Sequence, residues 1–288
     1  MVLNLQTFMK RHLTDEINWL ALSVLVIFIY PIQLAAQEIE VPYVATPPEV
    51  VDEMLKIAGA GDGDYLVDLG SGDGRIVIEA AKRGAIGHGV DLDGDLVQLS
   101  FKKAEKAGVS DRVIFFEEDI FETDFSMASV VTIYMSNDIN LRLRPLLFDK
   151  LKPGTRVVSH IFHMDDWQPD RQTAVNRHNI YKWIIPADVE GTWKWRANEV
   201  DFQLSLNQEF QKIAESGVII SDENKPYELI ESSIRGERIT IVIKFGEHKY
   251  VYNGKVSGDE INGSVQIRDG DDSRIESWNA ERISAISN

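Results

Sequence analysis

The segment of residues 67–93, VDLGSGDGRIVIEAAKRGAIGHGVDLD, constrains the fold more than any other part of this chain. It is an apolar strand, a loop with Gly70, Gly72 and Gly74, a helix, and a second strand that ends on Asp91. Glycines let the backbone approach a ligand closely, and the helix that follows directs its free N–H groups and positive dipole end toward that ligand. The pattern predicts an anion or carboxylate at the loop, with Asp91 accepting hydrogen bonds from ribose hydroxyls.

Three details decide which nucleotide fits. The glycine spacing is G-x-G-x-G rather than the G-x-G-x-x-G of dinucleotide folds, Asp68 stands two places before the first glycine, and an acidic run ends at Asp119. An acid at Asp68 repels a pyrophosphate, whereas the amino-acid end of S-adenosylmethionine offers it a cation and offers the loop amides a carboxylate. Asp119 is then placed to accept from the adenine amino group. A dehydrogenase that binds a nicotinamide dinucleotide is the weaker interpretation.

Each of these aspartates, taken alone, is more often a cap of a strand end or a turn than a ligand. The glycine loop and the three acidic positions occur in register at the ends of successive strands. Together they favour a nucleotide site over separate structural caps.

The segments around this loop alternate between helix and strand patterns. A helix rich in buried-type residues precedes it, and further helices are expected at 74–84, 95–108 and 141–151. Strands are expected at 65–70, 86–92, 112–119, 129–135 and 155–162. This alternation predicts an α/β fold with a doubly wound, mostly parallel, Rossmann-like sheet.

From about residue 191 the chain changes to short alternating runs separated by Gly, Asn and Asp turns, which predicts a small antiparallel β-barrel or sandwich. Trp193, Trp195 and Phe202 alternate with polar residues, which favours a core stripe over a sugar- or lipid-binding face. Pro186 is the expected boundary. The predicted divisions are 1–37 as signal peptide or anchor, 38–188 as the nucleotide-binding domain, and 189–288 as a small all-β domain.

The first residues have the three parts of a secretory signal: Lys10 and Arg11, the apolar run WLALSVLVIFIY, and the small residues before Gln37. The uninterrupted apolar run is shorter than the roughly 20 residues that a spanning helix needs. A cleaved signal, an uncleaved anchor with membrane association through residues 19–36, and a buried helix are the three interpretations. The first two place the rest of the chain in the periplasm or outside the cell, or anchored to the inner membrane, although the cytosolic face stays open.

Charge and cysteine content exclude several function classes. The formal net charge is −16, which repels phosphate backbones, and no basic run offsets it, so no nucleic-acid partner is expected. The chain has no cysteine, which excludes disulfides, thiolate nucleophiles and Cys-based zinc sites.

The motifs VDLGSGDGR, GVDLD and EEDIF resemble the cofactor-binding half of class I S-adenosylmethionine-dependent methyltransferases over residues 42–186. More narrowly, PYVATPPEVVDEML and the segment 130–170 are similar to a family of membrane-associated protein-lysine methyltransferases that includes those of the ATP synthase c-ring protein. The resemblance implies S-adenosyl-L-methionine as cofactor and a lysine side chain of a protein as methyl acceptor.

The resemblance also implies roles for individual positions. Tyr43, Thr46 and Pro47 would lie at the edge of the cofactor, and Asp91 and Asp119 on its ribose and adenine. Under its amino-acid end would lie the loop residues Gly70, Ser71, Gly72 and Gly74, with Asp68 on the ammonium. The family is expected to carry a larger acid at the ribose position, where this chain has Asp91, and either length can reach the hydroxyls.

The segment YMSND after the fourth strand is where amine methyltransferases commonly place polar acceptors. Tyr134, Asn137 and Asp138 are therefore the candidates for orienting the amine, and Tyr134 could equally be a partly buried strand-end aromatic. No dedicated base is required, because the enzyme mainly aligns and desolvates the reactants.

The segment SHIFHMDDW contains His160, His163, Asp165 and Asp166, which could form a metal site. On an extended strand His160 and His163 point to opposite faces, so a strand-end loop lining the substrate entrance is preferred and no metal is expected.

The sequence thus predicts a protein-lysine N-methyltransferase with a β domain for substrate docking or membrane positioning. The alternative is an exported protein that keeps the fold without the activity and binds a nucleoside-type ligand, which would remove the need to supply the cofactor outside the cytosol.

Overall fold

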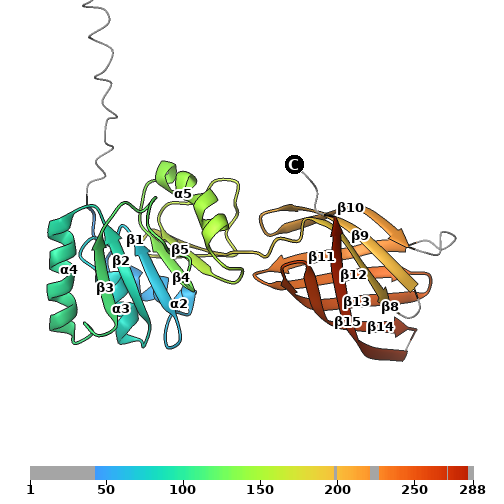
Figure 1. Ribbon diagram of the computed structural model, residues 1–288. Helices are drawn as coiled ribbons and strands as arrows, with labels where there is room; N and C mark the ends of the chain where they lie inside the picture. The colour runs from blue at the N-terminus through green and yellow to red at the C-terminus, as the bar shows by residue number, and fades with distance from the viewer. Residues whose placement is uncertain (1–42, 198–199, 221–226, 271, 285–288) are drawn as a thin grey trace, which may run out of the picture. The chain divides into compact units, whose positions relative to one another are not determined.

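A computed structural model of the chain describes residues 43–197, 200–220, 227–270 and 272–284 (Figure 1). The expected signal peptide or anchor at residues 1–37 lies outside these ranges. Within them, no helix has both the length and the hydropathy that crossing a bilayer requires.

Helices and strands alternate from residue 48 to residue 160, as the sequence predicts. The helices are α2 (Pro48–Ala58), α3 (Arg75–Lys82), α4 (Gly94–Ala107) and α5 (Asn137–Lys150). The strands of this half are β1 (Tyr65–Leu69), β2 (Ile86–Asp91), β3 (Val113–Glu117), β4 (Val130–Ile133), β5 (Arg156–His160), β6 (Arg171–Val175) and β7 (His178–Ile184).

These strands form one seven-stranded sheet in the order β3-β2-β1-β4-β5-β7-β6. Strands β1 to β5 are parallel, and β7 runs antiparallel to both β5 and β6. The predicted mostly parallel, doubly wound sheet is confirmed. The strand order reverses direction between β1 and β4, and in sheets of this kind ligands bind beyond the carboxyl ends of the strands at that point.

The sheet is covered unequally on its two faces (Figure 1). Helices α2, α3 and α4 pack side by side on one face, where Val50, Met54 and Leu55 of α2 are fully buried. The other face packs against α5 through Leu143 and Leu147. No helix joins β3 to β4 or β5 to β6.

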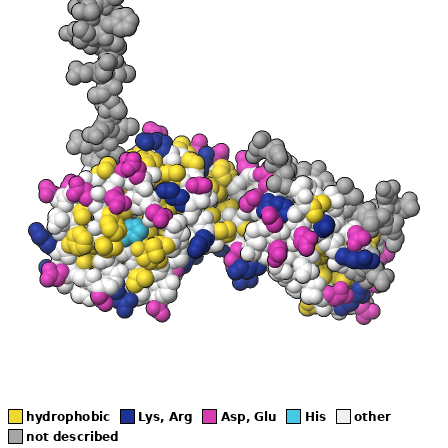
Figure 2. All heavy atoms as spheres, viewed as in Figure 1, with side chains coloured by type: hydrophobic (Ala, Val, Ile, Leu, Met, Phe, Trp, Pro, Cys, Tyr) yellow, Lys and Arg dark blue, Asp and Glu magenta, His cyan; other side chains and the backbone are white. Residues whose placement is uncertain are grey.

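Part of the second face is therefore open. Hydrophobic side chains gather there over β1–β3 around one histidine (Figure 2). His88 of β2 makes edge-to-face ring contacts with Tyr65 of β1 and Phe116 of β3.

The structure corrects two boundaries. Helix α5 begins at Asn137 rather than near residue 141, because the Ser136 hydroxyl accepts a hydrogen bond from the Ile139 N–H and caps an additional turn. The segment before Pro186, expected to be a linker, instead includes the end of β7, whose Trp183 is fully buried in the core under α5. The β6–β7 hairpin was not predicted.

The second half of the chain forms an eight-stranded antiparallel sheet in the order β10-β9-β8-β15-β14-β13-β12-β11. Its edge strands approach each other, since the Ser232 hydroxyl of β11 donates to the Ile213 carbonyl of β10. The strands are β8 (Gly191–Ala197), β9 (Val200–Glu209), β10 (Lys212–Ile220), β11 (Tyr227–Arg235), β12 (Arg238–Phe245), β13 (His248–Ser257), β14 (Glu260–Asp269) and β15 (Asp272–Ser284).

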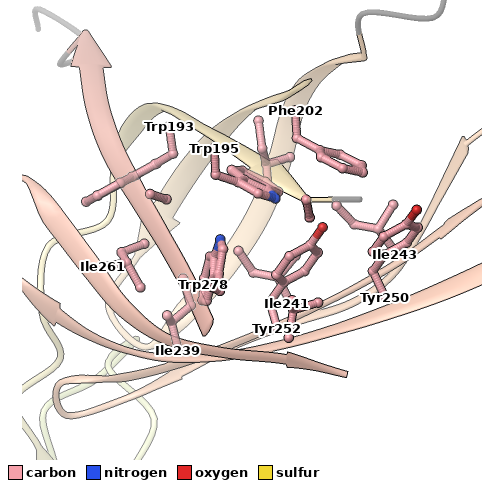
Figure 3. Close-up of a cluster of buried hydrophobic side chains, with 14 of the residues drawn as sticks. Trp193, Trp195, Phe202, Ile239, Ile241, Ile243, Tyr250, Tyr252, Ile261 and Trp278 are labelled. Carbon is pink, nitrogen blue, oxygen red and sulfur yellow. The ribbon is translucent and has the colours of Figure 1, made fainter. Parts of the chain in front are cut away.

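The concave side of this barrel-like sheet holds a separate aromatic core (Figure 3). Trp195 and Phe202, from β8 and β9, stack on each other with ring centroids 5.4 Å apart, and Trp195 contacts Tyr252 and Trp278 from other strands. Trp193, Trp195 and Phe202 are all buried, which confirms the core stripe. The two sheets occupy residues 65–184 and 191–284, on either side of the boundary predicted at 188.

Candidate functional site

The candidate site lies where β1, β2 and β4 end. The glycine loop follows β1, Asp91 is the last residue of β2, and Tyr134 follows β4. These segments flank the position at which the strand order reverses, so sequence-distant residues meet at one edge of the sheet.

Glycine is required in the loop for two reasons. Gly70 and Gly72 have φ values of +80° and +53°, the left-handed region that side chains disfavour. A Cβ at Gly70 would also overlap the side chain of Met135, and one at Gly72 would overlap the ring of Tyr43. The loop therefore lies directly beneath two side chains that flank it from other segments.

The loop amides are used differently from the sequence-based expectation. The N–H groups of Gly70 and Ser71 both donate to the Val90 carbonyl at 2.8 Å, and the Gly72 N–H donates to Asp91 Oδ2 at 2.7 Å. These amides hold the loop against β2 and do not face a ligand. A carboxylate at the loop has to bind the N–H groups of the first turn of α3, which have no partners within the helix.

Asp68 is a buried acid inside the site, only 2% exposed. The Thr132 hydroxyl of β4 donates to its Oδ1 at 2.6 Å. Burial raises the pKa of Asp68 to about 7, and the charges of Asp91 and Asp73 add to the rise while the Thr132 hydrogen bond opposes it. A cationic ligand group would favour the carboxylate form, which suits the ammonium expected here.

An ion-pair network fixes the loop to the segment before α2. Asp73 pairs with Arg75 and with Lys103. Burial raises the pKa of Asp73, but hydrogen bonds from Arg75 and Lys103 outweigh it and hold the pKa well below its usual range. Arg75 Nη1 also donates to the Thr46 carbonyl at 2.7 Å, and Nη2 lies 3.4 Å from the Tyr43 hydroxyl. Sequence reasoning missed Arg75, although it directly follows the last glycine.

The remaining residues expected at the cofactor lie along the same edge. Asp91 also accepts from the Asp93 N–H through Oδ1, and Asp119 Oδ1 accepts from the Phe121 N–H. Each carboxylate keeps lone pairs for a further donor. The Ser71 hydroxyl is buried and has no hydrogen-bond partner among the described residues.

These features fit S-adenosylmethionine. Asp68 would hold the ammonium, the first turn of α3 the carboxylate, Asp91 the ribose and Asp119 the adenine. The orphaned Ser71 hydroxyl and the cradle that a Cβ at Gly70 or Gly72 would fill are independent signs of a ligand in close contact with the loop.

The acceptor-side candidates differ in their surroundings. Tyr134 is half-buried, burial raises its pKa, and its ring lies 4.0 Å from that of His160. Asn137 Oδ1 is buried and has no partner among the described residues. Asp138 is exposed in the first turn of α5, where a negative charge complements the helix dipole.

The four residues of the SHIFHMDDW segment do not come together. His160 is fully buried, His163 is exposed and accepts from the Asp165 N–H, and Asp166 pairs with Arg144. In the part of the chain that the structure describes, no three His, Asp or Glu residues are grouped to hold a metal ion. The loop does not simply line an entrance, since its Met164 and Trp167 are fully buried. These apolar side chains pack into the core under α5.

Comparisons with known proteins agree with this geometry. A family model described as the ANTKMT methyltransferase domain matches residues 68–171. The protein-lysine N-methyltransferase of Saccharolobus islandicus is 40% identical over 153 residues, covering 50% of this chain and 94% of that protein. The mouse adenine nucleotide translocase lysine N-methyltransferase is 34% identical over 134 residues, covering 46% of this chain and 57% of that protein.

The human lysine N-methyltransferase that acts on the c-ring protein of ATP synthase is a further relative. It is 31% identical over 173 residues, covering 60% of this chain and 73% of that protein.

A solved structure is also similar. The crystal structure described as an RNA methyltransferase from Salinibacter ruber, in complex with S-adenosyl-L-homocysteine, is 50% identical with a TM-score of 0.50. It covers 51% of this chain and 96% of that chain.

Proposed function

Because this chain belongs to the S-adenosylmethionine-dependent protein-lysine N-methyltransferases, we propose that it methylates the ε-amino group of a lysine in a protein substrate. S-adenosylmethionine is its cofactor. The identity of the substrate protein and the roles of single residues belong to the proposal.

The observation that carries the proposal is the state of Asn137. Its side-chain carbonyl oxygen is buried without a partner among the described residues, two positions after Met135, which covers the glycine loop. Leaving a buried acceptor unpaired costs about 1–3 kcal/mol. An N–H of the lysine ε-amine would satisfy this oxygen and at the same time orient the amine.

The bound cofactor supplies a methyl group on a sulfonium, and the chain has to align, desolvate and deprotonate the amine. The Tyr134 ring provides a half-buried aromatic wall beside the end of β4. Asn137, in the first turn of α5, provides the acceptor. The two residues lie on a short segment whose geometry the Ser136 cap fixes.

Substitution of the two residues tests the assignment. Asn137→Ala and Tyr134→Phe should each lower kcat by at least about tenfold, the usual scale for loss of a positioning contact. Binding of S-adenosylhomocysteine, measured by isothermal titration, should change less than twofold. Asp138→Asn is the matched control on the same turn and should cost less than about threefold because its side chain is exposed. Full-rate turnover in both Asn137→Ala and Tyr134→Phe would refute the assignment.

RNA is the second candidate substrate, because the Salinibacter ruber protein, 50% identical, is described as an RNA methyltransferase. The net charge of −16 argues for a protein instead, since an acidic chain is repelled by a phosphate backbone. Incubation with labelled cofactor and total RNA should leave the RNA unlabelled. Label in RNA and none in protein would reverse the choice of substrate.

The location of the enzyme is proposed from sequence alone. The basic, apolar and small-residue pattern of residues 1–37 supports an exported or membrane-anchored protein. Intact-mass measurement of the expressed protein should show loss of a segment that ends near Ala36, or retention of it in the membrane fraction. An intact Met1 in a soluble cytosolic fraction would contradict both.

A further inference from the structure

A buried histidine beside the candidate site has no role in the function described so far. His160, the last residue of β5, has no exposed surface. Its Nδ1 lies 3.2 Å from the Thr46 hydroxyl, and its Nε2 lies 2.8 Å from Nδ1 of His178. A buried polar ring is unfavourable unless its nitrogens are bonded, and here both have partners.

The three residues form a continuous hydrogen-bonded chain from the site outward. Thr46 is buried just before α2 and its carbonyl is held by Arg75 of the loop network. The ring of Tyr134 lies against His160, with centroids 4.0 Å apart and planes at 40°. His178 begins β7 and is half-buried. One end of the chain therefore adjoins the candidate amine site, and the other is open to solvent.

The groups that face the chain leave His160 uncharged. Tyr134 faces it from the end of β4, Arg75 reaches Thr46 from α3, and Glu49 of α2 interacts electrostatically with His178. No carboxylate among the described residues is hydrogen-bonded to His160. Burial lowers the pKa of His160 to about 4, and the neighbouring His178 contributes to that decrease. A neutral imidazole can accept a proton at one nitrogen while it releases one from the other.

The reaction needs such a route. A lysine side chain is an ammonium at neutral pH, with a reference pKa of about 10.4, and has no lone pair for attack until a proton leaves. Since the amine is desolvated in the site, water cannot freely take that proton.

On the basis of the proposed function, we propose that Thr46, His160 and His178 conduct the proton of the substrate ammonium to solvent. The ammonium passes one proton to the Thr46 oxygen, and the Thr46 hydroxyl proton moves to His160 Nδ1. The proton on His160 Nε2 moves to His178 Nδ1, and His178 releases one from Nε2 to water. The net change is one proton from the ammonium to water, which leaves a neutral amine with its lone pair.

The test uses the full chain and poly-L-lysine as the methyl acceptor, with kcat measured from pH 6 to pH 10. His160→Phe keeps a ring against Tyr134 but has no nitrogen. It should lower kcat about 100-fold at pH 7, in the usual range for a proton-transfer group. The loss should shrink as pH rises and nearly vanish near pH 10, where the free amine is present in solution. KM for the cofactor and the affinity for S-adenosylhomocysteine should stay within twofold.

A second variant covers the case in which His160→Phe does not fold. His178→Ala is at a half-buried position, should lower kcat in the same pH-dependent way, and should be rescued by imidazole in solution. His88→Phe is the matched control, a buried histidine of the same sheet, and should leave the pH profile of kcat unchanged.

The outcomes separate this inference from the proposed function. If the wild-type chain methylates poly-L-lysine and the His160 and His178 variants match its pH profile, the proton route is wrong and the proposed function stands. If S-adenosylhomocysteine binds but the wild-type chain methylates no lysine of poly-L-lysine or of a cell-extract protein at any pH, the proposed function fails and the route fails with it.

Discussion

Asp68 determines the pH dependence of cofactor binding. It is buried at the end of β1 with the Thr132 hydroxyl as a hydrogen-bond donor, and burial brings its pKa to about 7. Only the carboxylate form pairs with an ammonium, whereas the neutral form leaves that cation unpaired.

We therefore expect the affinity for S-adenosylmethionine to fall as pH decreases below 7. The ionised fraction of Asp68 drops about tenfold per pH unit below its pKa, so the Kd between pH 7.5 and pH 5.5 should rise by more than tenfold. Isothermal titration across this range measures the change.

Asp68→Asn is the control for this effect. Its Kd should be high and nearly independent of pH, because the amide cannot ionise. A wild-type Kd that stays constant down to pH 5.5 would show that Asp68 does not pair with the ammonium.

The glycine loop and the segment before α2 act together as elements. Gly72 and Gly108, the residue after α4, both have positive φ, but only Gly72 has a side chain, that of Tyr43, in the space of its missing Cβ. Gly72→Ala and Gly108→Ala should each lower stability by about 1 kcal/mol from backbone strain.

Only Gly72→Ala should also displace Tyr43 and abolish most of the cofactor affinity. Thermal unfolding and S-adenosylhomocysteine titration of the two variants separate strain from steric overlap. Equal affinities in the two variants would mean that Tyr43 and the loop need not approach each other for binding.

The elements that the sequence predicted well are those with strong local signals. Strands β1 to β5 and helices α2 to α4 follow hydrophobic periodicity and turn residues, and the structure confirms them. The β6–β7 hairpin was missed because its exposed strand β6 has no apolar face, and the pairing of β7 with β5 depends on tertiary contacts. The start of α5 was missed because a single cap, Ser136, extends the helix beyond its apolar pattern.

The site was predictable only in part for the same reason. The glycine loop, Asp68 and Asp91 follow from local motifs. The bonding of the loop amides to β2 and the His160–His178 contact depend on which strands are neighbours. Periodicity on one strand cannot reveal a partner that lies on another.

For the whole molecule, the formal net charge of −16 favours cationic partners. We expect KM for a lysine-rich peptide to rise several-fold when ionic strength increases from about 0.05 M to about 0.5 M, since salt screens exposed charges. The affinity for S-adenosylhomocysteine should change little, because its partners lie within the site. A peptide KM independent of salt would mean that the overall charge does not contribute to substrate binding.

The measurement that tests the central claim most directly is transfer of a deuterium-labelled methyl group from S-adenosylmethionine to proteins of a cell extract, followed by tandem mass spectrometry. The wild-type chain should place labelled methyl on lysine ε-nitrogens of one or a few proteins, and Asp68→Asn and Asn137→Ala should place far less. Label confined to RNA, to other side chains or to no macromolecule, in a chain that still binds S-adenosylhomocysteine, would contradict a protein-lysine methyltransferase.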